Sequence, residues 1–243
     1  MRGLSSRRVI LTGGASGIGR AAALRLAQEG CVLGIFDLDE AGAEATAAEC
    51  KGAQAYRVDI TDRAQIEAAV AAFGPVEGLA NVAGWDTPVD FLATDRALWD
   101  KVVQINLYGP LNMHHVVVRG MAERRFGRVV NVASDAGRVG SSGEAVYAAC
   151  KGGIIAFTKT LARELARKGV TLNVVCPGPT DTRLFDNFRA ASPSIGDALA
   201  RAIPLRRLGK PDDYAGMIAF LLSDDAEYIT GQTVSVSGGL TMV

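Results

Sequence analysis

A tyrosine and a lysine stand four residues apart in the segment Tyr147-Ala148-Ala149-Cys150-Lys151. On a helix this spacing puts the phenol and the ammonium group on one face, where both can act on one substrate. A nearby positive charge lowers the pKa of tyrosine and favours the phenolate. The pair therefore predicts an acid–base centre for a hydroxyl or carbonyl group, although Tyr and Lys at this spacing also occur as an exposed surface pair.

A second candidate site is a glycine-rich segment after the first apolar run, Thr12-Gly13-Gly14-Ala15-Ser16-Gly17-Ile18-Gly19. Glycine lets the main chain approach a phosphate closely, and the amides and dipole of a helix start attract negative charge. The segment predicts a pyrophosphate-binding turn. The alternative is a glycine-rich turn that holds no ligand.

An acidic residue, Asp37, ends the second apolar run, where α/β folds usually hydrogen-bond the adenosine ribose of a dinucleotide. Its charge would repel the 2′-phosphate of NADP. Leu38 follows it, and no Arg or Lys occurs between Gly13 and Gly19, so the expected cofactor is NAD. Alternatively, Asp37 or Asp39 caps the helix that follows.

The elements that carry these residues alternate along the chain. Short β-branched runs predict strands at Val9–Leu11, Val32–Phe36, Ala55–Val58, Gly78–Val82, Arg128–Ser134, Thr171–Cys176 and Thr233–Ser237, and longer stretches predict helices at Arg20–Gln28 and Ala41–Cys50. This rhythm predicts an α/β, Rossmann-type fold, with a doubly wound parallel sheet of about seven strands between two helical layers. We expect one domain over residues 1–243, with a mobile, proline-rich substrate lid at about 180–210.

Composition excludes several classes of protein. Hydrophobic residues make up 49% of the chain, and 26 basic residues balance 26 acidic ones, so neither nucleic acid nor a membrane is an expected partner. Four scattered cysteines and the adjacent His114 and His115 lack the spacing of metal ligands, and no metal is expected. The N-terminal apolar run is too short for a signal sequence, which makes a cytoplasmic location the expectation.

The pattern T-G-x-x-x-G-I-G, together with Y-x-x-x-K, resembles the short-chain dehydrogenase/reductase family. The resemblance implies hydride transfer between NAD and a secondary alcohol or its ketone. It also implies a catalytic tetrad of Asn106, Ser134, Tyr147 and Lys151, in which Tyr147 moves the proton, Ser134 steadies the substrate oxygen, and Asn106 holds a water in a relay to the lysine. Taken singly, Ser134 could be a strand-end turn residue and Asn106 an ordinary polar helix residue.

The same resemblance implies a set of cofactor-binding residues from the glycine turn, the strand ends and the segment after the sixth expected strand. They are Gly13, Ser16, Gly17, Ile18, Gly19, Asp37, Leu38, Asp59, Ile60, Asn81, Ala83, Gly84, Tyr147, Lys151, Pro177, Gly178, Thr180 and Thr182. Val82 departs from the family, which often has a second Asn there. Asn81 is expected to brace the sheet beside the cofactor.

Residues 140–153, 173–182 and 235–242, with Gly84-Trp85-Asp86 and Met113-His114-His115, resemble the family's branch of bacterial 2-hydroxycyclohexanecarboxyl-CoA dehydrogenases. This resemblance implies an alicyclic β-hydroxyacyl-CoA, such as 2-hydroxycyclohexane-1-carboxyl-CoA, as the favoured substrate. Trp85 would line its pocket, or else pack in the core or an interface. Basic residues between Arg183 and Lys210 could attract substrate phosphates or carboxylate, or form a solvated surface.

Other functions stay open on the sequence alone. They are a dehydrogenase or ketoreductase of cyclic alcohols, sugars, steroids or 3-oxoacyl thioesters of an acyl carrier, and a nonenzymatic NAD-binding sensor. The family resemblance further implies a homotetramer joined through the helices that begin near Trp99 and Tyr147.

Overall fold

A seven-stranded parallel sheet forms the centre of the computed structural model, which describes residues 1–191 and 194–243. The strands lie in the order β3-β2-β1-β4-β5-β6-β7. Their bounds are β1 (Arg8–Thr12), β2 (Val32–Asp37), β3 (Gln54–Arg57), β4 (Gly78–Asn81), β5 (Gly127–Val132), β6 (Val170–Pro177) and β7 (Thr233–Val236). The strand order reverses between β1 and β4, and ligands of α/β sheets bind at the carboxyl ends of the strands at such a point.

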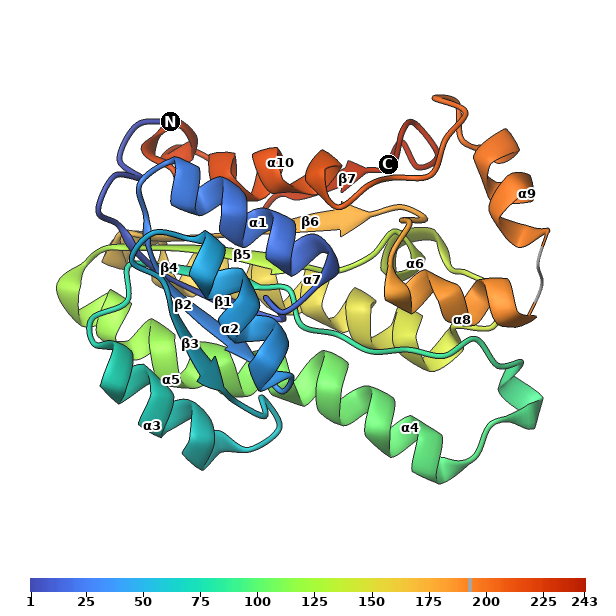
Figure 1. Cartoon of the computed structure of the whole chain (residues 1–243), viewed down its shortest axis with the longest axis horizontal. Coiled ribbons are helices and arrows are strands. Elements are labelled where there is room, and N and C mark those ends of the chain that lie inside the picture. The colour runs from blue at the N-terminus through green and yellow to red at the C-terminus, as the bar shows by residue number, and fades with distance from the viewer. Residues whose placement is uncertain (192–193) are drawn as a thin grey trace.

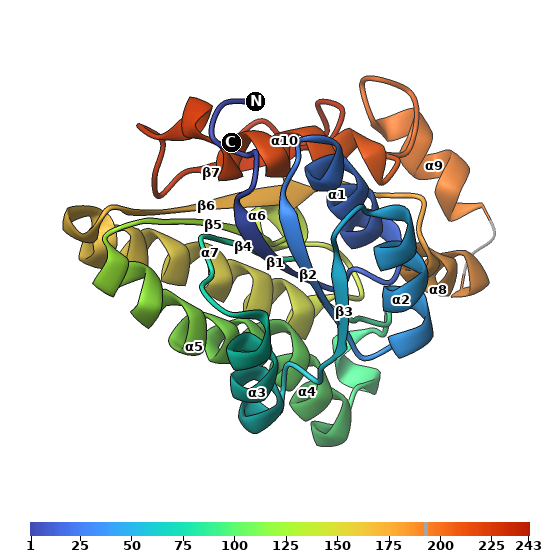
Figure 2. The same cartoon turned by 60° about the vertical axis from the view of Figure 1, so that its left-hand side comes forward.

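Helices cover both faces of this sheet, as Figures 1 and 2 show. One face carries α1 (Gly17–Gln28), α2 (Glu40–Glu49) and α10 (Asp212–Leu222), and the other carries α3 (Arg63–Phe73), α4 (Arg96–Val103), α5 (Gly109–Arg124) and α7 (Ala145–Leu165). A short helix, α6 (Ala136–Val139), precedes α7, and single 3₁₀ turns lie at Phe91–Ala93, Ala166–Lys168 and Asp224–Ala226. The expected doubly wound, three-layer fold is confirmed.

Each face of the sheet has its own hydrophobic core, because alternate side chains of a strand point to opposite faces. In β1, Val9 and Leu11 pack with Leu26 of α1 in one cluster, whereas Ile10 packs with Met113 of α5 in the other. All six residues of β5 are buried. The central strands are mostly apolar because both of their faces are covered, as is usual in parallel sheets.

The segment after β6 differs from the irregular lid that its prolines suggest. It forms α8 (Arg183–Ala191) and α9 (Ile195–Ala202), which lie beyond the carboxyl end of the sheet in Figure 1. An isolated parallel bridge between Thr180 and Gly209 ties the two ends of this excursion together. Pro204 and Pro211 follow α9, where proline is compatible with the preceding helix.

Candidate active site

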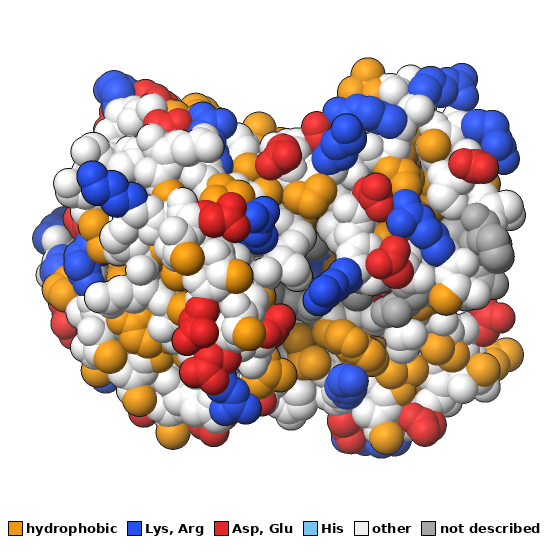
Figure 3. All heavy atoms as spheres, in the orientation of Figure 1, with side chains coloured by type: hydrophobic (Ala, Val, Ile, Leu, Met, Phe, Trp, Pro, Cys, Tyr) orange, Lys and Arg blue, Asp and Glu red, His pale blue; other side chains and the backbone are white. Residues whose placement is uncertain are grey.

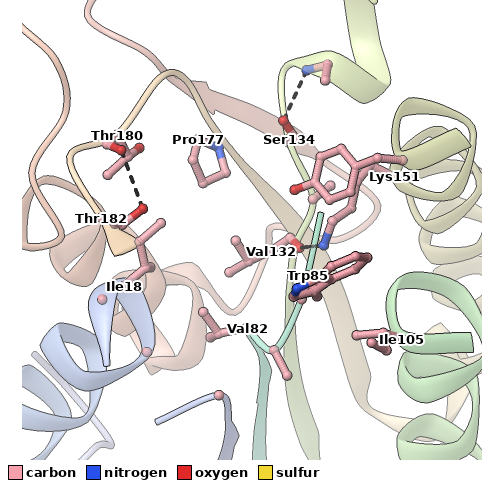
Figure 4. Close-up of a pocket in the computed structure, with 18 of the residues that line it drawn as sticks. Ile18, Val82, Trp85, Ile105, Val132, Ser134, Lys151, Pro177, Thr180 and Thr182 are labelled. Carbon is pink, nitrogen blue, oxygen red and sulfur yellow. Dashed lines mark hydrogen bonds between the residues drawn. The ribbon is translucent and has the colours of Figure 1, made fainter. Parts of the chain in front are cut away.

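A cavity of about 1190 Å³ opens above the carboxyl ends of the central strands. It lies between the body of the sheet and the α8–α9 lobe, where Figure 3 shows the surface hollowed. In Figure 4, Ser134, Lys151 and Trp85 lie on one side of the space, and Ile18, Thr180 and Thr182 lie on the other. One cavity therefore joins the glycine turn to the tyrosine–lysine pair.

The glycine turn is closed so tightly that side chains would not fit. Gly13 has a φ of +74°, and a Cβ there would lie 2.7 Å from the Cα of Ala83. A Cβ on Gly19 would lie 2.0 Å from the carbonyl oxygen of Gly13. The turn thus brings bare main chain to the cavity wall, which is the form a bound pyrophosphate needs.

The start of α1 is also left open, unlike the starts of the next helices. The side chains of Asp39, Asp62 and Asp95 cap α2, α3 and α4 by accepting hydrogen bonds from main-chain amides. Ser16, the N-cap of α1, makes no such bond. The helix dipole and the first amides of α1 therefore favour an anion supplied from the cavity.

The carboxylate of Asp37 is held in place at the end of β2. Its two oxygens accept hydrogen bonds from the main-chain amides of Ala15, at 2.9 Å, and Asp39, at 3.0 Å. Asp39 rather than Asp37 caps α2, so the two roles that the sequence left open fall to different residues. Asp37 lines the cavity beside the exposed Leu38, a position that fits a ribose diol and not a 2′-phosphate.

Tyr147 and Lys151 lie in the first two turns of α7 with their side chains buried, at 8% and 3% exposure. The Tyr147 hydroxyl is hydrogen-bonded to the side chain of Ser134, which also accepts a bond from the amide of Ala136 at 3.1 Å. Lys151 Nζ donates to the carbonyl oxygen of Val132 at 3.1 Å and lies 5.4 Å from the centre of the Tyr147 ring. This burial excludes the alternative of an exposed surface pair.

The electrostatics of the pair differ from the sequence expectation. Burial lowers the pKa of Lys151 to about 8. The pKa of Tyr147 is raised, because burial and the nearby carboxyl groups of Glu144 and Asp86 oppose the phenolate. Without a cofactor, burial and these carboxyl groups act on the pKa of Tyr147 in the direction opposite to the one expected from Lys151.

Asn106 lies behind the cavity wall and is completely buried. It stands in a π-helical turn, Gln104–Tyr108, so the expected interruption between α4 and α5 is present. Its amide group donates to the carbonyl oxygens of Trp85, at 2.6 Å, and Val102, at 2.9 Å, and its oxygen accepts from the amide of Trp85. The side chain thus fixes the chain after β4 against the helix.

Asn81 is likewise absent from the cavity wall, and its side chain joins two strands. It donates to Asn131 of β5 at 2.9 Å, and Asn131 in turn donates to Thr158 of α7 at 2.9 Å. The residues after Asn81, Ala83 and Gly84, do line the cavity. Asn81 therefore braces the sheet next to the site, as the sequence predicts.

The other predicted cofactor residues all contribute to the wall. They are Ser16, Gly17, Ile18, Asp59, Ile60, Pro177, Gly178, Thr180 and Thr182. The hydroxyl of Thr180 donates to Gly178 and lies 2.6 Å from the Tyr214 hydroxyl, so it is engaged within the protein. The hydroxyl of Thr182 makes one long bond, at 3.4 Å, and is the freer of the two to meet a ligand.

Sequence reasoning missed a pair of acidic residues at the substrate side. Glu144 lines the cavity three residues before Tyr147, and its side chain is hydrogen-bonded to that of the buried Asp86. Trp85, next to Asp86, lines the cavity with Lys101 Nζ 3.7 Å from its ring centre. The only feature of the sequence that points to this pair is an acidic residue, Glu144, directly before the helix that carries Tyr147 and Lys151.

Much of the positive charge of the lid is neutralised locally. Arg189 pairs with Asp181 and Asp186, and Arg207 pairs with Asp213 at 2.5 Å. Arg183 lines the cavity. The described residues include no group of three or more His, Cys, Asp or Glu side chains arranged to hold a metal ion, and no helix among them is long and apolar enough to cross a bilayer.

Comparison with known proteins places this site in a family. A family profile described as enoyl-(acyl carrier protein) reductase matches residues 13–241. A 3-oxoacyl-[acyl-carrier-protein] reductase of Thermotoga maritima is 36% identical, covering 98% of this chain and 99% of its own length. An acetoacetyl-CoA reductase of Allochromatium vinosum is also 36% identical with the same coverage.

A solved structure is similar over nearly the whole chain. It is a 3-ketoacyl-(acyl-carrier-protein) reductase from Brucella melitensis complexed with NADH, with a TM-score of 0.91 and 32% identity, covering 98% of this chain and all of its own. The fold with its seven-stranded parallel sheet agrees with this match. The chain therefore belongs to the short-chain dehydrogenase/reductase family of enzymes, oxidoreductases that act on CH–OH groups with a nicotinamide cofactor.

Proposed function

We propose that the protein is an NAD(H)-dependent oxidoreductase that interconverts β-oxoacyl and β-hydroxyacyl thioesters, with an alicyclic acyl-CoA as the favoured substrate. One observation carries the proposal: Ser134, Tyr147 and Lys151 share a single cavity with the glycine turn and Asp37. The proposed active unit is one domain, residues 1–243, with α8 and α9 as the substrate lid.

In the proposed reaction, NAD(H) supplies or accepts the hydride when it is bound. Tyr147 donates its phenolic proton to the substrate oxygen during reduction and takes it back during oxidation. Ser134 donates a hydrogen bond to the same oxygen, which strengthens as negative charge develops there. Lys151 stabilises the phenolate that remains after the proton has left. The raised pKa of Tyr147 keeps the phenol protonated, so the protein without ligand is poised for reduction.

The preference for NAD over NADP rests on Asp37. Its carboxylate is oriented by two amides and lies where the adenosine ribose of a dinucleotide would meet the end of β2. No Arg or Lys occurs between Gly13 and Gly19, and Arg20, the next residue, pairs with Glu49. The NADH complex of the Brucella relative supports the same choice.

The thioester substrate rests on the relatives and on the resemblance described above. Two relatives are named for a 3-oxoacyl thioester of an acyl carrier or for acetoacetyl-CoA. The cyclic substrate 2-hydroxycyclohexane-1-carboxyl-CoA belongs to the same chemical class, a β-hydroxyacyl thioester. Arg183 at the cavity wall offers a charge for CoA phosphates, and Trp85 offers an apolar surface for the ring.

The test is a comparison of substrates with purified protein. We expect NADH to be oxidised by 2-oxocyclohexane-1-carboxyl-CoA and acetoacetyl-CoA, with the cyclic thioester giving the higher kcat/KM, and NADPH to be a poor donor. Sugars, steroids and simple cyclic ketones should react weakly. Activity with these and none with either thioester would refute the substrate class. Cofactor binding without turnover of any of them would favour a sensor.

The assembly we propose is a homotetramer. Phe91 stacks on Trp99 at 5.4 Å beside the exposed Tyr108, which leaves aromatic surface on α4 and the segments flanking it. Exposed aromatic patches of this kind are typical of interfaces. Light scattering coupled to gel filtration should give four times the 25.4 kDa chain mass. A monomer at micromolar concentration would refute the proposal.

A further inference from the structure

Asp86 and Glu144 bring two carboxyl groups together at the substrate end of the cavity. Asp86 lies in the loop after β4, and Glu144 is the N-cap residue of α7. Their side chains are hydrogen-bonded to each other. A carboxylate can only accept a hydrogen bond, so this contact requires a proton on one of the two groups. The pair therefore carries one negative charge and one shared proton.

The surrounding structure explains which group holds the proton. Asp86 is only 3% exposed, and burial together with the charge of Glu144 raises its pKa to about 7. Glu144 stands at the positive end of the α7 dipole and accepts a further hydrogen bond from the side chain of Ser141. Burial raises the pKa of Glu144 as well, but the helix dipole and the bonds from Ser141 and Asp86 act in the opposite direction and favour its ionised form. Asp86 is thus the donor and Glu144 the acceptor.

Main-chain hydrogen bonds fix the two segments that carry the pair. The amide of Val89 donates to the carbonyl oxygen of Gly143 at 2.9 Å, and the amide of Ala148 donates to that of Glu144 at 2.7 Å. Asp86 and Glu144 both act electrostatically on Tyr147. The charge of the pair is therefore felt where the substrate oxygen must lie, next to Ser134 and Tyr147.

One cation acts on the pair. Lys151 acts electrostatically on Asp86, and its ammonium donates to the carbonyl oxygen of Val132. Lys101 Nζ lies 3.7 Å from the ring centre of Trp85. Cys150 and Tyr147 have raised pKa values and stay neutral.

We infer that the Asp86–Glu144 pair is a specificity determinant that selects neutral esters and thioesters of β-oxo acids and rejects the free acids. The inference rests on the proposed function. Hydrolysis of a β-oxoacyl thioester leaves a carboxylate one carbon away from the reacting carbonyl. That carboxylate would stand beside the negative charge of the pair in a buried site, where like charges a few ångströms apart repel strongly. A neutral ester or thioester has no such penalty.

The experiment compares ethyl 2-oxocyclohexane-1-carboxylate with freshly prepared 2-oxocyclohexane-1-carboxylate, which share the ring and differ in charge. We measure kcat/KM for both with NADH, using the wild type, Glu144→Gln, Asp86→Asn and Glu164→Gln. Glu164 is an exposed carboxylate on the same helix and serves as the matched control. The wild type should prefer the ester by about a hundredfold, a repulsion of the order expected at an effective dielectric constant of about 20. Glu144→Gln should cut this ratio at least about tenfold through a gain with the free acid, and Glu164→Gln should leave it unchanged.

Asp86→Asn keeps the charge of Glu144 and should retain the preference, whereas an unchanged ester-to-acid ratio in Glu144→Gln would overturn the inference. A second measurement is independent of turnover: infrared spectra of the protein at neutral pH should show a protonated carboxylic acid that is lost in Asp86→Asn and kept in Glu164→Gln. Absence of that band from the wild type would also overturn it. If the wild type reduces neither the ester nor a thioester, the proposed function fails, and the infrared result still decides whether the charged pair exists.

Discussion

His114 and His115 are the two histidines of the chain, and they provide a test of the polar network behind the active site. His114 is 2% exposed, with its Nδ1 2.6 Å from the carbonyl oxygen of Pro110 and its Nε2 3.2 Å from Nδ2 of Asn131. Nδ1 therefore carries the proton, and Nε2 accepts from the Asn131 amide. A proton added to Nε2 would face the Asn131 amide donor, and burial lowers the pKa of His114 to about 4 from an ordinary 6.5.

The magnitude follows from that difference. Between about pH 6.5 and about pH 4 the histidine of the unfolded chain is protonated, whereas that of the folded chain stays neutral. The free energy of unfolding therefore decreases as the pH falls from about 6.5 to about 4. At about 1.4 kcal/mol per pKa unit, the full loss is about 3 kcal/mol, and about 2 kcal/mol of it falls between about pH 7 and pH 5. The exposed His115, on the same helix, provides the matched control.

The assay is urea unfolding followed by circular dichroism, at a fixed protein concentration, for the wild type, His114→Gln and His115→Gln. The raised pKa of Asp86 stabilises the fold as the pH falls, so the informative quantity is the difference between wild type and variant. The advantage of the wild type over His114→Gln should shrink by about 2 kcal/mol between about pH 7 and pH 5. A difference that stays constant with pH, or an equal change in His115→Gln, would refute the reasoning.

Three further predictions concern the site itself. Tyr147→Phe should lower kcat roughly 10²- to 10⁴-fold and leave the Kd for NADH unchanged by fluorescence titration, whereas Tyr228→Phe, on a fully exposed side chain, should alter neither value. Asp37→Asn should reduce the preference for NADH over NADPH in kcat/KM at least about tenfold, because a charged hydrogen bond is worth about 1.5–3 kcal/mol; an unchanged ratio would count against a ribose contact. Gly19→Ala should weaken NADH binding more than about tenfold because its Cβ would lie 2.0 Å from the carbonyl oxygen of Gly13, while Gly216→Ala, in α10, should bind normally.

The sheet could be predicted from the sequence because each strand carries its own local signal. Runs such as Val32–Phe36 are apolar along their length, which indicates a strand covered on both faces. The ends of the strands carry a weaker signal than their centres: β3 begins at Gln54, whereas the sequence predicts a start at Ala55. This edge strand has one neighbour and half-exposed side chains, so its pattern is weaker than that of the central strands.

The lid could not be predicted in detail, because proline content obscured two amphipathic helices. The side chain of Phe185 in α8 is buried at 6% exposure, and the pairing of Arg189 with Asp181 joins α8 to the chain before it. Charge counting over residues 183–210 left out Asp181 and Asp213, which lie just outside that range and neutralise two of its arginines. Local composition therefore overstated both the irregularity and the net charge of this segment.

Groups of the site that lie on one helix could be predicted from the sequence, whereas groups that come from separate segments could not. Tyr147 and Lys151 are one helical turn apart, so their sequence spacing determines their geometry. Asp86 and Glu144 come from loops that meet only when α7 packs beside the end of β4, and no local pattern reports that contact. The pKa of Tyr147 depends on both kinds of contact.

A lysine one turn away predicts a lowered pKa for Tyr147, but burial and the nearby carboxyl groups of Glu144 and Asp86 raise it instead. Proton transfer from Tyr147 to a substrate oxygen needs a protonated phenol at the start, and abstraction from an alcohol needs a phenolate. The Asp86–Glu144 pair therefore affects the favoured direction as well as the substrate. Removing its charge should lower the pKa of Tyr147 and shift the alkaline limb of the reduction rate to lower pH. This shift, measured in Glu144→Gln against Glu164→Gln, would link the carboxyl pair directly to the proton that Tyr147 transfers.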